Sequence, residues 1–96
     1  MTIKRLLDQI FLQRKGGKTS AKIVDLLLVR PYNGSQIARI IKMDYNTIEY
    51  HLDILCESKL VMCESDSYGS LYYPTDLLLN NHEEYEKIKE MITITT

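Results

Sequence analysis

The chain has 96 residues, of which 45% are hydrophobic and 26% charged, and its formal net charge is −1. This length suits one compact domain and not two, and the composition is that of a globular protein and not of a disordered chain. Its apolar runs are far shorter than the roughly 20 residues that a membrane span needs, and the first residues lack the apolar stretch of a secretory signal. We therefore expect a single cytoplasmic domain over residues 1–96, with no membrane partner.

The charges are divided unevenly along the chain. Residues 1–42 hold nine basic and two acidic residues, a formal charge of +7, whereas residues 43–96 hold three basic and eleven acidic ones, a charge of −8. A basic half can face phosphate while an acidic half faces away from it. Both halves can equally be ordinary solvated surface, so the net charge alone does not indicate a nucleic-acid partner.

The first third of the chain has the pattern of two amphipathic helices. Apolar residues recur three and four apart within residues 2–14, which predicts a helix, and a pair of glycines then interrupts it. The second helix is expected to begin at Thr19 or Ser20, whose hydroxyl can accept from a first-turn amide. It should stop before Pro31, which disfavours helical backbone at the preceding residue.

Two more helices with a tight turn between them are expected next. Ser35 can cap a short helix over residues 36–42, and Asp44 can cap a longer helix over about residues 45–58. The longer helix has an apolar stripe spaced four and three apart, which marks its inner side: Ile48, Leu52 and Leu55.

After the longer helix the hydrophobic period changes to that of a strand. Residues 61–65 and 70–73 alternate on either side of a turn, which predicts a β-hairpin. The order of elements is then helix, helix, short helix, turn, longer helix, hairpin and helix. It predicts a mostly α-helical winged helix-turn-helix fold (α+β) with flanking N- and C-terminal helices. In such a fold the longer helix enters the major groove of DNA and the hairpin, or wing, over about residues 61–73 lies near the backbone or minor groove.

The helix-turn-helix stretch also carries a specific local pattern. It reads RPYNGSQIARIIKMDYNTIEYHLDILCESKLV from Arg30 to Val61, with Thr47-Ile48-x-x-His51-Leu52-x-x-Leu55 and then Leu60-Val61 as its most specific part. This stretch resembles the core of ArsR-like winged-helix regulators, the archaeal ones especially. The likeness covers roughly residues 18–74, and helices over residues 1–15 and 75–92 are compatible with it. The resemblance implies a transcription regulator that binds double-stranded DNA, usually as a homodimer formed through outer and terminal helices.

The resemblance places base-reading side chains on the first two turns of the longer helix, at Tyr45, Asn46, Glu49 and Tyr50. Asn46 can pair with adenine through two hydrogen bonds, Glu49 can accept from cytosine, and Thr47 can donate to a phosphate. Tyr50 can contact phosphate or sugar, or it can simply lie over its own helix. The remaining expected DNA contacts are Ser35, Gln36, Arg39, Lys42, Lys18, Lys22 and Tyr68.

The outer face of the longer helix is acidic, which favours an alternative. It carries Glu49, Asp53 and Glu57, and the wing has no basic residue between residues 64 and 70. Because affinity for DNA rests on cations near phosphate, we expect modest affinity that falls steeply with salt. The alternative function is a winged helix that binds a basic protein partner through this acidic face.

The terminal helices are expected to form a homodimer. The last helix, capped by Asn80 or Asn81 and running to about residue 92, follows a short apolar stretch, residues 77–79, that fits no single element. The last helix and the first helix each carry an apolar stripe, and together these stripes offer more apolar surface than the winged-helix core needs. Pairing the two helices across a two-fold axis would bury this surface. The alternative is that both helices pack onto their own domain. The stripes are Ile3, Leu6, Leu7, Ile10, Tyr85, Ile88 and Ile92.

The sequence gives little reason to expect an enzyme, a cofactor or a metal site. It has no glycine-rich phosphate loop, no nucleophile motif with a paired base and no HExxH pattern. Cys56 and Cys63 are expected to be reduced, structural residues, since a secreted domain of this size would usually have more disulfides. They also lack the close spacing of the cysteine pair in a metal sensor. His51 is expected to be a packed residue and His82 an exposed helix-start residue. The sequence identifies no small-molecule effector.

Overall fold

One helical segment with a change of pitch begins the chain. The structure is a computed structural model that describes residues 2–67 and 69–95, with side chains described up to residue 92. Thr2 caps α1 (Ile3–Leu7) by accepting from Arg5 N at 3.2 Å. The segment continues as the π-helix η1 (Asp8–Gln13). The predicted helix over residues 2–14 is therefore present, but its second half is wound more widely than a regular α-helix.

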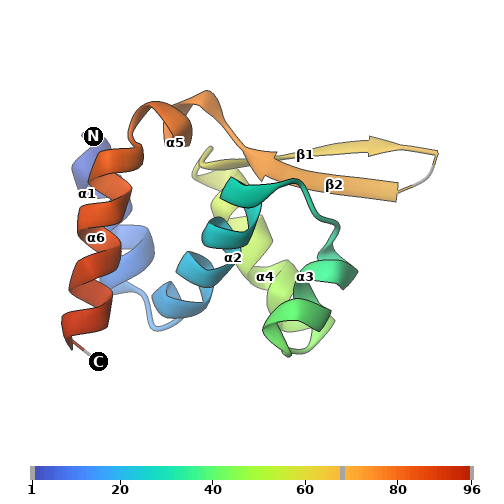
Figure 1. Cartoon of the computed structure of the whole chain (residues 1–96), viewed down its shortest axis with the longest axis horizontal. Coiled ribbons are helices and arrows are strands. Elements are labelled where there is room, and N and C mark those ends of the chain that lie inside the picture. The colour runs from blue at the N-terminus through green and yellow to red at the C-terminus, as the bar shows by residue number, and fades with distance from the viewer. Residues whose placement is uncertain (1, 68, 96) are drawn as a thin grey trace.

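The middle of the chain forms three packed helices and a hairpin, as Figure 1 shows. These helices contact one another, and the hairpin packs against all three. This is the winged helix-turn-helix fold that the sequence predicts. The elements are α2 (Gly17–Val29), α3 (Gly34–Ile41), α4 (Tyr45–Glu57), β1 (Val61–Asp66) and β2 (Gly69–Pro74).

The predicted start of α2 was wrong. The helix begins at Gly17 without a side-chain cap, and Ser20 lies buried inside it. Gly17 is required there because a Cβ atom would lie 2.0 Å from the carbonyl oxygen of Phe11. The glycine pair therefore belongs to a tight junction between η1 and α2, and the hydroxyl of Thr19 is not needed as a cap.

The turn of the helix-turn-helix is closed by short-range hydrogen bonds. Asn33, and not Ser35, caps α3: its side chain accepts from Gln36 N at 2.8 Å, and the Gln36 side chain accepts from Asn33 N at 2.9 Å. Lys42 ends α3 in the left-handed conformation with φ 65°. Asp44 caps α4 as predicted, by accepting from the amides of residues 46 and 47.

The wing is a two-stranded antiparallel hairpin, and an isolated β-bridge joins β2 to the connection before α3. In its register Cys63 is opposite Tyr72 and Glu64 is opposite Leu71. Tyr32, in the connection before α3, pairs with Tyr72 through two backbone hydrogen bonds of 2.9 and 3.4 Å. The wing is thereby tied to the start of the helix-turn-helix.

The terminal helices pack against each other within one chain. Beside α1 and η1 lies α6 (His82–Thr95), at the end of the molecule away from the wing (Figure 1). The short apolar stretch before it forms α5 (Asp76–Asn80), capped by Thr75. No helix in the described part of the chain is both long and apolar enough to cross a membrane.

This packing corrects the assignment of the terminal apolar stripes to a dimer interface. Five members of the stripes are core residues of the single chain, each at most 9% exposed. Only Ile3 and Leu6 remain half-buried. The apolar surface is covered by the chain itself because α6 folds back onto η1. The five core residues are Leu7, Ile10, Tyr85, Ile88 and Ile92.

Candidate nucleic-acid interface

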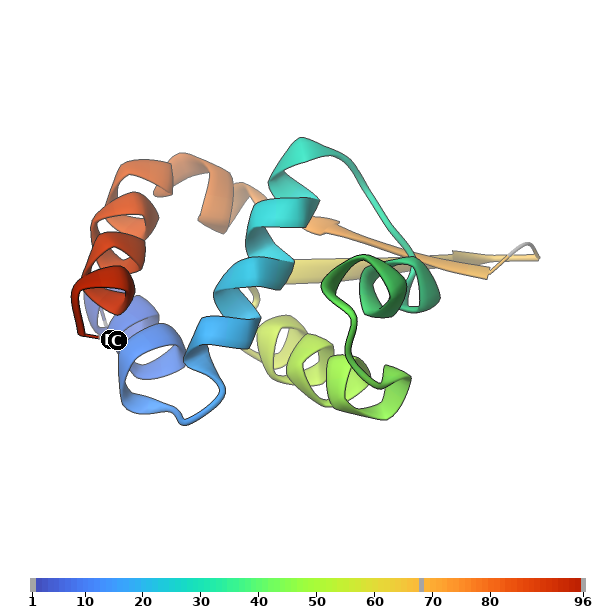
Figure 2. The same cartoon turned by 60° about the horizontal axis from the view of Figure 1, so that its bottom comes forward.

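The first turns of α4 present polar side chains to solvent. Because Asp44 caps the helix and Ile48 and Leu52 bury its inner side, the opposite side is left open. Asn46 is exposed, and Tyr50 is 61% exposed. The Tyr50 ring lies edge-on to the imidazole ring of His51, with a distance of 5.3 Å between the ring centroids. Figure 2 shows α3 and the start of α4 at one edge of the molecule, beside the hairpin.

A cleft separates the start of α4 from the wing. Its volume is about 290 Å³, and Glu49 and Tyr45 line it from the side of α4. Glu49 is only half-exposed, in contrast to Asn46 and Tyr50. The other lining residues are Asn33, Gly34, Ser35, Gly69, Ser70 and Tyr72.

Tyr72 forms the wing side of this cleft. Its pKa is raised well above the usual range, chiefly by burial and then by the neighbouring Cys63, with smaller contributions from Cys56 and Glu49. The phenol is therefore neutral, and a hydrogen bond with the Cys63 side chain contributes to the raised pKa of Tyr72.

The short helix α3 contributes fewer free polar groups than its sequence suggests. Ser35, Arg39 and Lys42 are exposed. The side-chain oxygen of Gln36, however, accepts from Asn33 N in the capping box. One of the two acceptor sites of the Gln36 oxygen is therefore already used within the helix-turn-helix.

The start of α2 carries exposed basic side chains and follows a loop that touches the middle of α4. Lys18 and Lys22 are exposed. The loop before α2 touches α4, since a Cβ atom on Gly16 would lie 2.3 Å from Cε1 of His51. Tyr68, which was predicted at the tip of the wing, lies outside the described residues.

A buried polar cluster holds α4 against the N-terminal segment. His51 is 5% exposed, and its Nδ1 lies 3.1 Å from Nη2 of Arg14 and 3.4 Å from Oγ of Ser20. The Arg14 guanidinium also donates to the carbonyl of Ile10 at 3.0 Å and to Ser20 at 3.1 Å. Since a guanidinium can only donate, Nδ1 is the acceptor and His51 is neutral. The sequence predicted a packed histidine but gave no sign of its partners, which lie 37 and 31 residues away.

The stability of the chain should fall as the pH is lowered from 7.5 to 5.5. Burial and the Arg14 charge lower the pKa of His51 below 6.5. The unfolded chain therefore binds this proton more readily, and the stabilising contribution of neutral His51 is lost as the pH falls below 6.5 towards the folded pKa. Urea unfolding at several pH values, in a His82→Gln background that removes the other imidazole, measures the effect. A His51→Gln variant with the same pH dependence would contradict this assignment.

Acidic side chains occupy the rest of α4 and the wing. Asp53 and Glu57 are exposed on α4, and Glu64 and Asp66 are exposed on β1. Cys56 is half-buried, and burial raises the pKa of its thiol, whereas Cys63 is exposed. Neither cysteine forms a disulfide, and no group of three or more metal-ligating side chains is placed to hold an ion within the described part of the chain.

Known proteins resemble this chain in structure but not detectably in sequence. No family model and no curated protein matches the sequence. Among solved structures, MarR from E. coli shares 14% identity and a TM-score of 0.65, over 94% of this chain and 65% of that one. A mutant form of ZitR from Lactococcus lactis shares 21% identity and a TM-score of 0.64, over 80% of this chain and 55% of that one. The adhesin competence repressor AdcR from Streptococcus pyogenes shares 15% identity and a TM-score of 0.64, over 97% of this chain and 75% of that one.

The chain spans 55% and 65% of the lengths of the ZitR and MarR chains. At these identities the likeness establishes the arrangement of the backbone. The helix order, the antiparallel hairpin and these structural neighbours together show that the chain has a winged helix-turn-helix fold.

Proposed function

We propose that the chain binds double-stranded DNA as a transcription regulator, with the first two turns of α4 in the major groove. The observation that carries the proposal is the exposed polar start of α4, where Asn46 and Tyr50 project from a helix whose inner side is buried. A helix placed in this way can reach base edges in the major groove. The resemblance of residues 18–74 to ArsR-like regulators supports the same function, and so does a structural neighbour that is named as a repressor.

Cations on two other elements would supply the phosphate contacts. Arg39 and Lys42 are exposed at the end of α3, and Lys18 and Lys22 are exposed on α2. Glu49, in the cleft beside Tyr72, would meet DNA only at the edge of the groove. With so few cations and an acidic wing, affinity should be modest at physiological salt.

Replacing Asn46 by alanine should weaken binding to a preferred site by about 1–3 kcal/mol, because a bidentate contact to adenine discriminates by that amount. The preferred site is first obtained by selecting bound fragments from random duplex DNA. Fluorescence anisotropy then compares the selected duplex with a scrambled one of equal length. The variant should lose affinity for the selected duplex and keep its affinity for the scrambled one.

Glu57→Gln is the matched control, because Glu57 is exposed at the far end of the same helix. It should leave the preference for the selected duplex intact. Equal preference in the Asn46→Ala variant and in the unmodified protein would show that α4 does not read bases through Asn46.

Lys42→Asn should reduce the dependence of log K on log salt by about 1, as expected for the loss of one phosphate contact. Asparagine removes the charge and tolerates the left-handed backbone at this position. Lys87→Asn, which removes an exposed lysine from α6, serves as the control and should leave the slope unchanged. If the Lys42→Asn and Lys87→Asn variants had the same dependence of log K on log salt, Lys42 would not contact a phosphate.

The acidic surface keeps a protein-binding winged helix as the second candidate. Asp53 and Glu57 on α4 are exposed, as are the acids of β1, and a basic partner would neutralise them. This function predicts that no duplex is retained even at low salt, whereas DNA binding predicts retention that is lost on adding salt.

We propose a homodimer as the DNA-binding form, which would place two α4 helices on successive major grooves. With the core stripes buried, we place the contact between copies on the outer side of α1 and α6. There Ile3 and Leu6 are half-buried and Met91 is 50% exposed. Sedimentation at high concentration that finds only an 11.2 kDa species would contradict the dimer.

A further inference from the structure

The two faces of the wing have different surroundings. Side chains alternate along a strand, so Tyr72 and Ser70 share one face, and both line the cleft beside α3 and α4. Leu71 and Tyr73 lie on the opposite face, together with Glu64, which is the cross-strand partner of Leu71. This second face does not point into the cleft beside α4.

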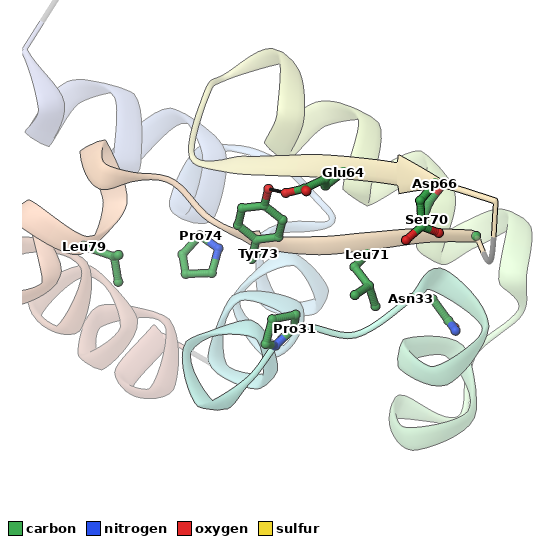
Figure 3. A pocket seen from close by; sticks show the side chains of 10 residues that line it. Pro31, Asn33, Glu64, Asp66, Ser70, Leu71, Tyr73, Pro74 and Leu79 are labelled. Carbon is green, nitrogen blue, oxygen red and sulfur yellow. Dashed lines mark hydrogen bonds between the residues drawn. The ribbon is translucent and has the colours of Figure 1, made fainter.

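A groove with a volume of about 700 Å³ lies mainly on this second face, and it reaches the edge of the cleft at Asn33, Gly69 and Ser70. Figure 3 shows it running along β2 from Pro74 and Leu79 at one end to Asn33 and Asp66 at the other. The volume is in the range of small-molecule sites, about 300–1,000 Å³. Its lining consists of Pro31, Asn33, Glu64, Asp66, Gly69, Ser70, Leu71, Tyr73, Pro74 and Leu79.

The groove leaves large apolar side chains open to solvent. Leu71 is 45% exposed and Leu79 is 49% exposed, although they belong to different elements. Pro31 and Pro74 add rigid apolar walls from the α2–α3 connection and from the end of β2. Exposed apolar residues that gather from several elements mark a binding surface more often than single exposed ones do.

Among the described residues that line the groove, the charged ones are both acids. Glu64 and Asp66 are both exposed on β1. The hydroxyl of Tyr73 donates to the Glu64 carboxylate, which holds that acid beside the ring of Tyr73. The guanidinium of Arg30, on the neighbouring connection, instead lies 4.6 Å above the ring of Tyr32.

We propose that this groove binds a lipophilic organic cation of low molecular mass. Its aromatic or aliphatic body would contact Leu71, Leu79 and the two prolines. Its charge would lie between the carboxylates and over the face of Tyr73, since cations are attracted both to acids and to aromatic faces. A neutral or anionic ligand of the same shape would gain the apolar contact but not the electrostatic one. The proposal does not depend on DNA binding.

The sharpest test compares two ions of nearly the same shape and opposite charge, tetraphenylphosphonium and tetraphenylborate. Each is titrated into the full chain, without DNA, while amide chemical shifts and heats of binding are recorded. Tetraphenylphosphonium should bind at least tenfold more tightly, which corresponds to about 1.4 kcal/mol. The shifts should centre on β2, on the connection before α3 and on α5.

Two double variants separate the electrostatic contribution to binding from the apolar one. Glu64→Gln combined with Asp66→Asn should weaken tetraphenylphosphonium binding about tenfold and leave tetraphenylborate binding unchanged or stronger. Leu71→Ser combined with Leu79→Ser should weaken the binding of both ions. The matched control is Glu83→Gln combined with Glu90→Gln, which removes two exposed acids from α6 and should change neither affinity.

Three outcomes would overturn the proposal. One is equal affinity for the two ions, and another is a tetraphenylphosphonium affinity that the Leu71 and Leu79 substitutions leave unchanged. The third is self-association through this face, detected as a dimer in sedimentation that Leu71→Ser dissociates. A failure of DNA binding would leave all these measurements unaffected, so this site and the proposed function can fail separately.

Discussion

Replacing Tyr85 by alanine is expected to lower the free energy of unfolding by about 3–5 kcal/mol, the usual cost of truncating a fully buried aromatic side chain. Tyr85 is 0% exposed, and its ring meets that of Phe11 edge-on at 5.2 Å. Its hydroxyl donates to Ala21 O at 3.0 Å and to Asp25 Oδ1 at 2.8 Å. Urea unfolding measures the loss, which is a large part of the roughly 5–15 kcal/mol that stabilises a typical domain.

Substitutions of Tyr85 also test whether the apolar stripes of the terminal helices pack within one chain or between two copies. Tyr85→Phe keeps the ring and removes only the hydrogen bonds to α2, so it should cost roughly 1–2 kcal/mol. Both losses should be independent of protein concentration, because the contacts lie within one chain. If the loss in the alanine variant instead grew as the protein was diluted, Tyr85 would have to lie in an interface between copies.

Gly17→Ala is the second substitution with a large expected effect, and its sign is the informative part. In an ordinary helix, alanine in place of glycine stabilises by about 1 kcal/mol. Here the added Cβ would lie 2.0 Å from the oxygen and 2.6 Å from the carbon of the Phe11 carbonyl. Backbone atoms must therefore move, and we expect a loss of about 3 kcal/mol in the free energy of unfolding.

The control for this substitution is the next residue along the helix. Lys18 is exposed on the first turn of α2, and Lys18→Ala should change the free energy of unfolding by less than about 0.5 kcal/mol. Thermal and urea unfolding of the two variants give the comparison. An increase in stability for Gly17→Ala would mean that α2 and the Phe11 carbonyl are not packed tightly at this junction.

Much of the candidate site follows from local periodicity. The spacing of Ile48, Leu52 and Leu55 predicted which side of α4 is buried, and all three are at most 1% exposed. The same spacing predicted that Asn46 and Tyr50 would face outwards, as they do. These predictions succeeded because a helix places residues on its faces by geometry alone.

Contacts between distant segments could not be predicted in this way. The sequence does not indicate that Gln36 uses its side-chain oxygen in a cap led by Asn33, or that Glu49 lines a cleft beside Tyr72. Both facts depend on how α3, α4 and the wing meet. The groove on the second face of the wing likewise depends on tertiary packing, because the α2–α3 connection and α5 bring Pro31 and Leu79 beside β2.

The order of the elements, the inner face of α4 and the cap at Asp44 follow from the amino-acid sequence, because each depends on residues a few positions apart. The partners of the terminal stripes and the Arg14–His51 contact, which joins residues 37 positions apart, depend on how the helices pack. An apolar stripe must be covered, but its pattern does not say by what. The return of α6 onto η1 settled that question in favour of the chain's own core.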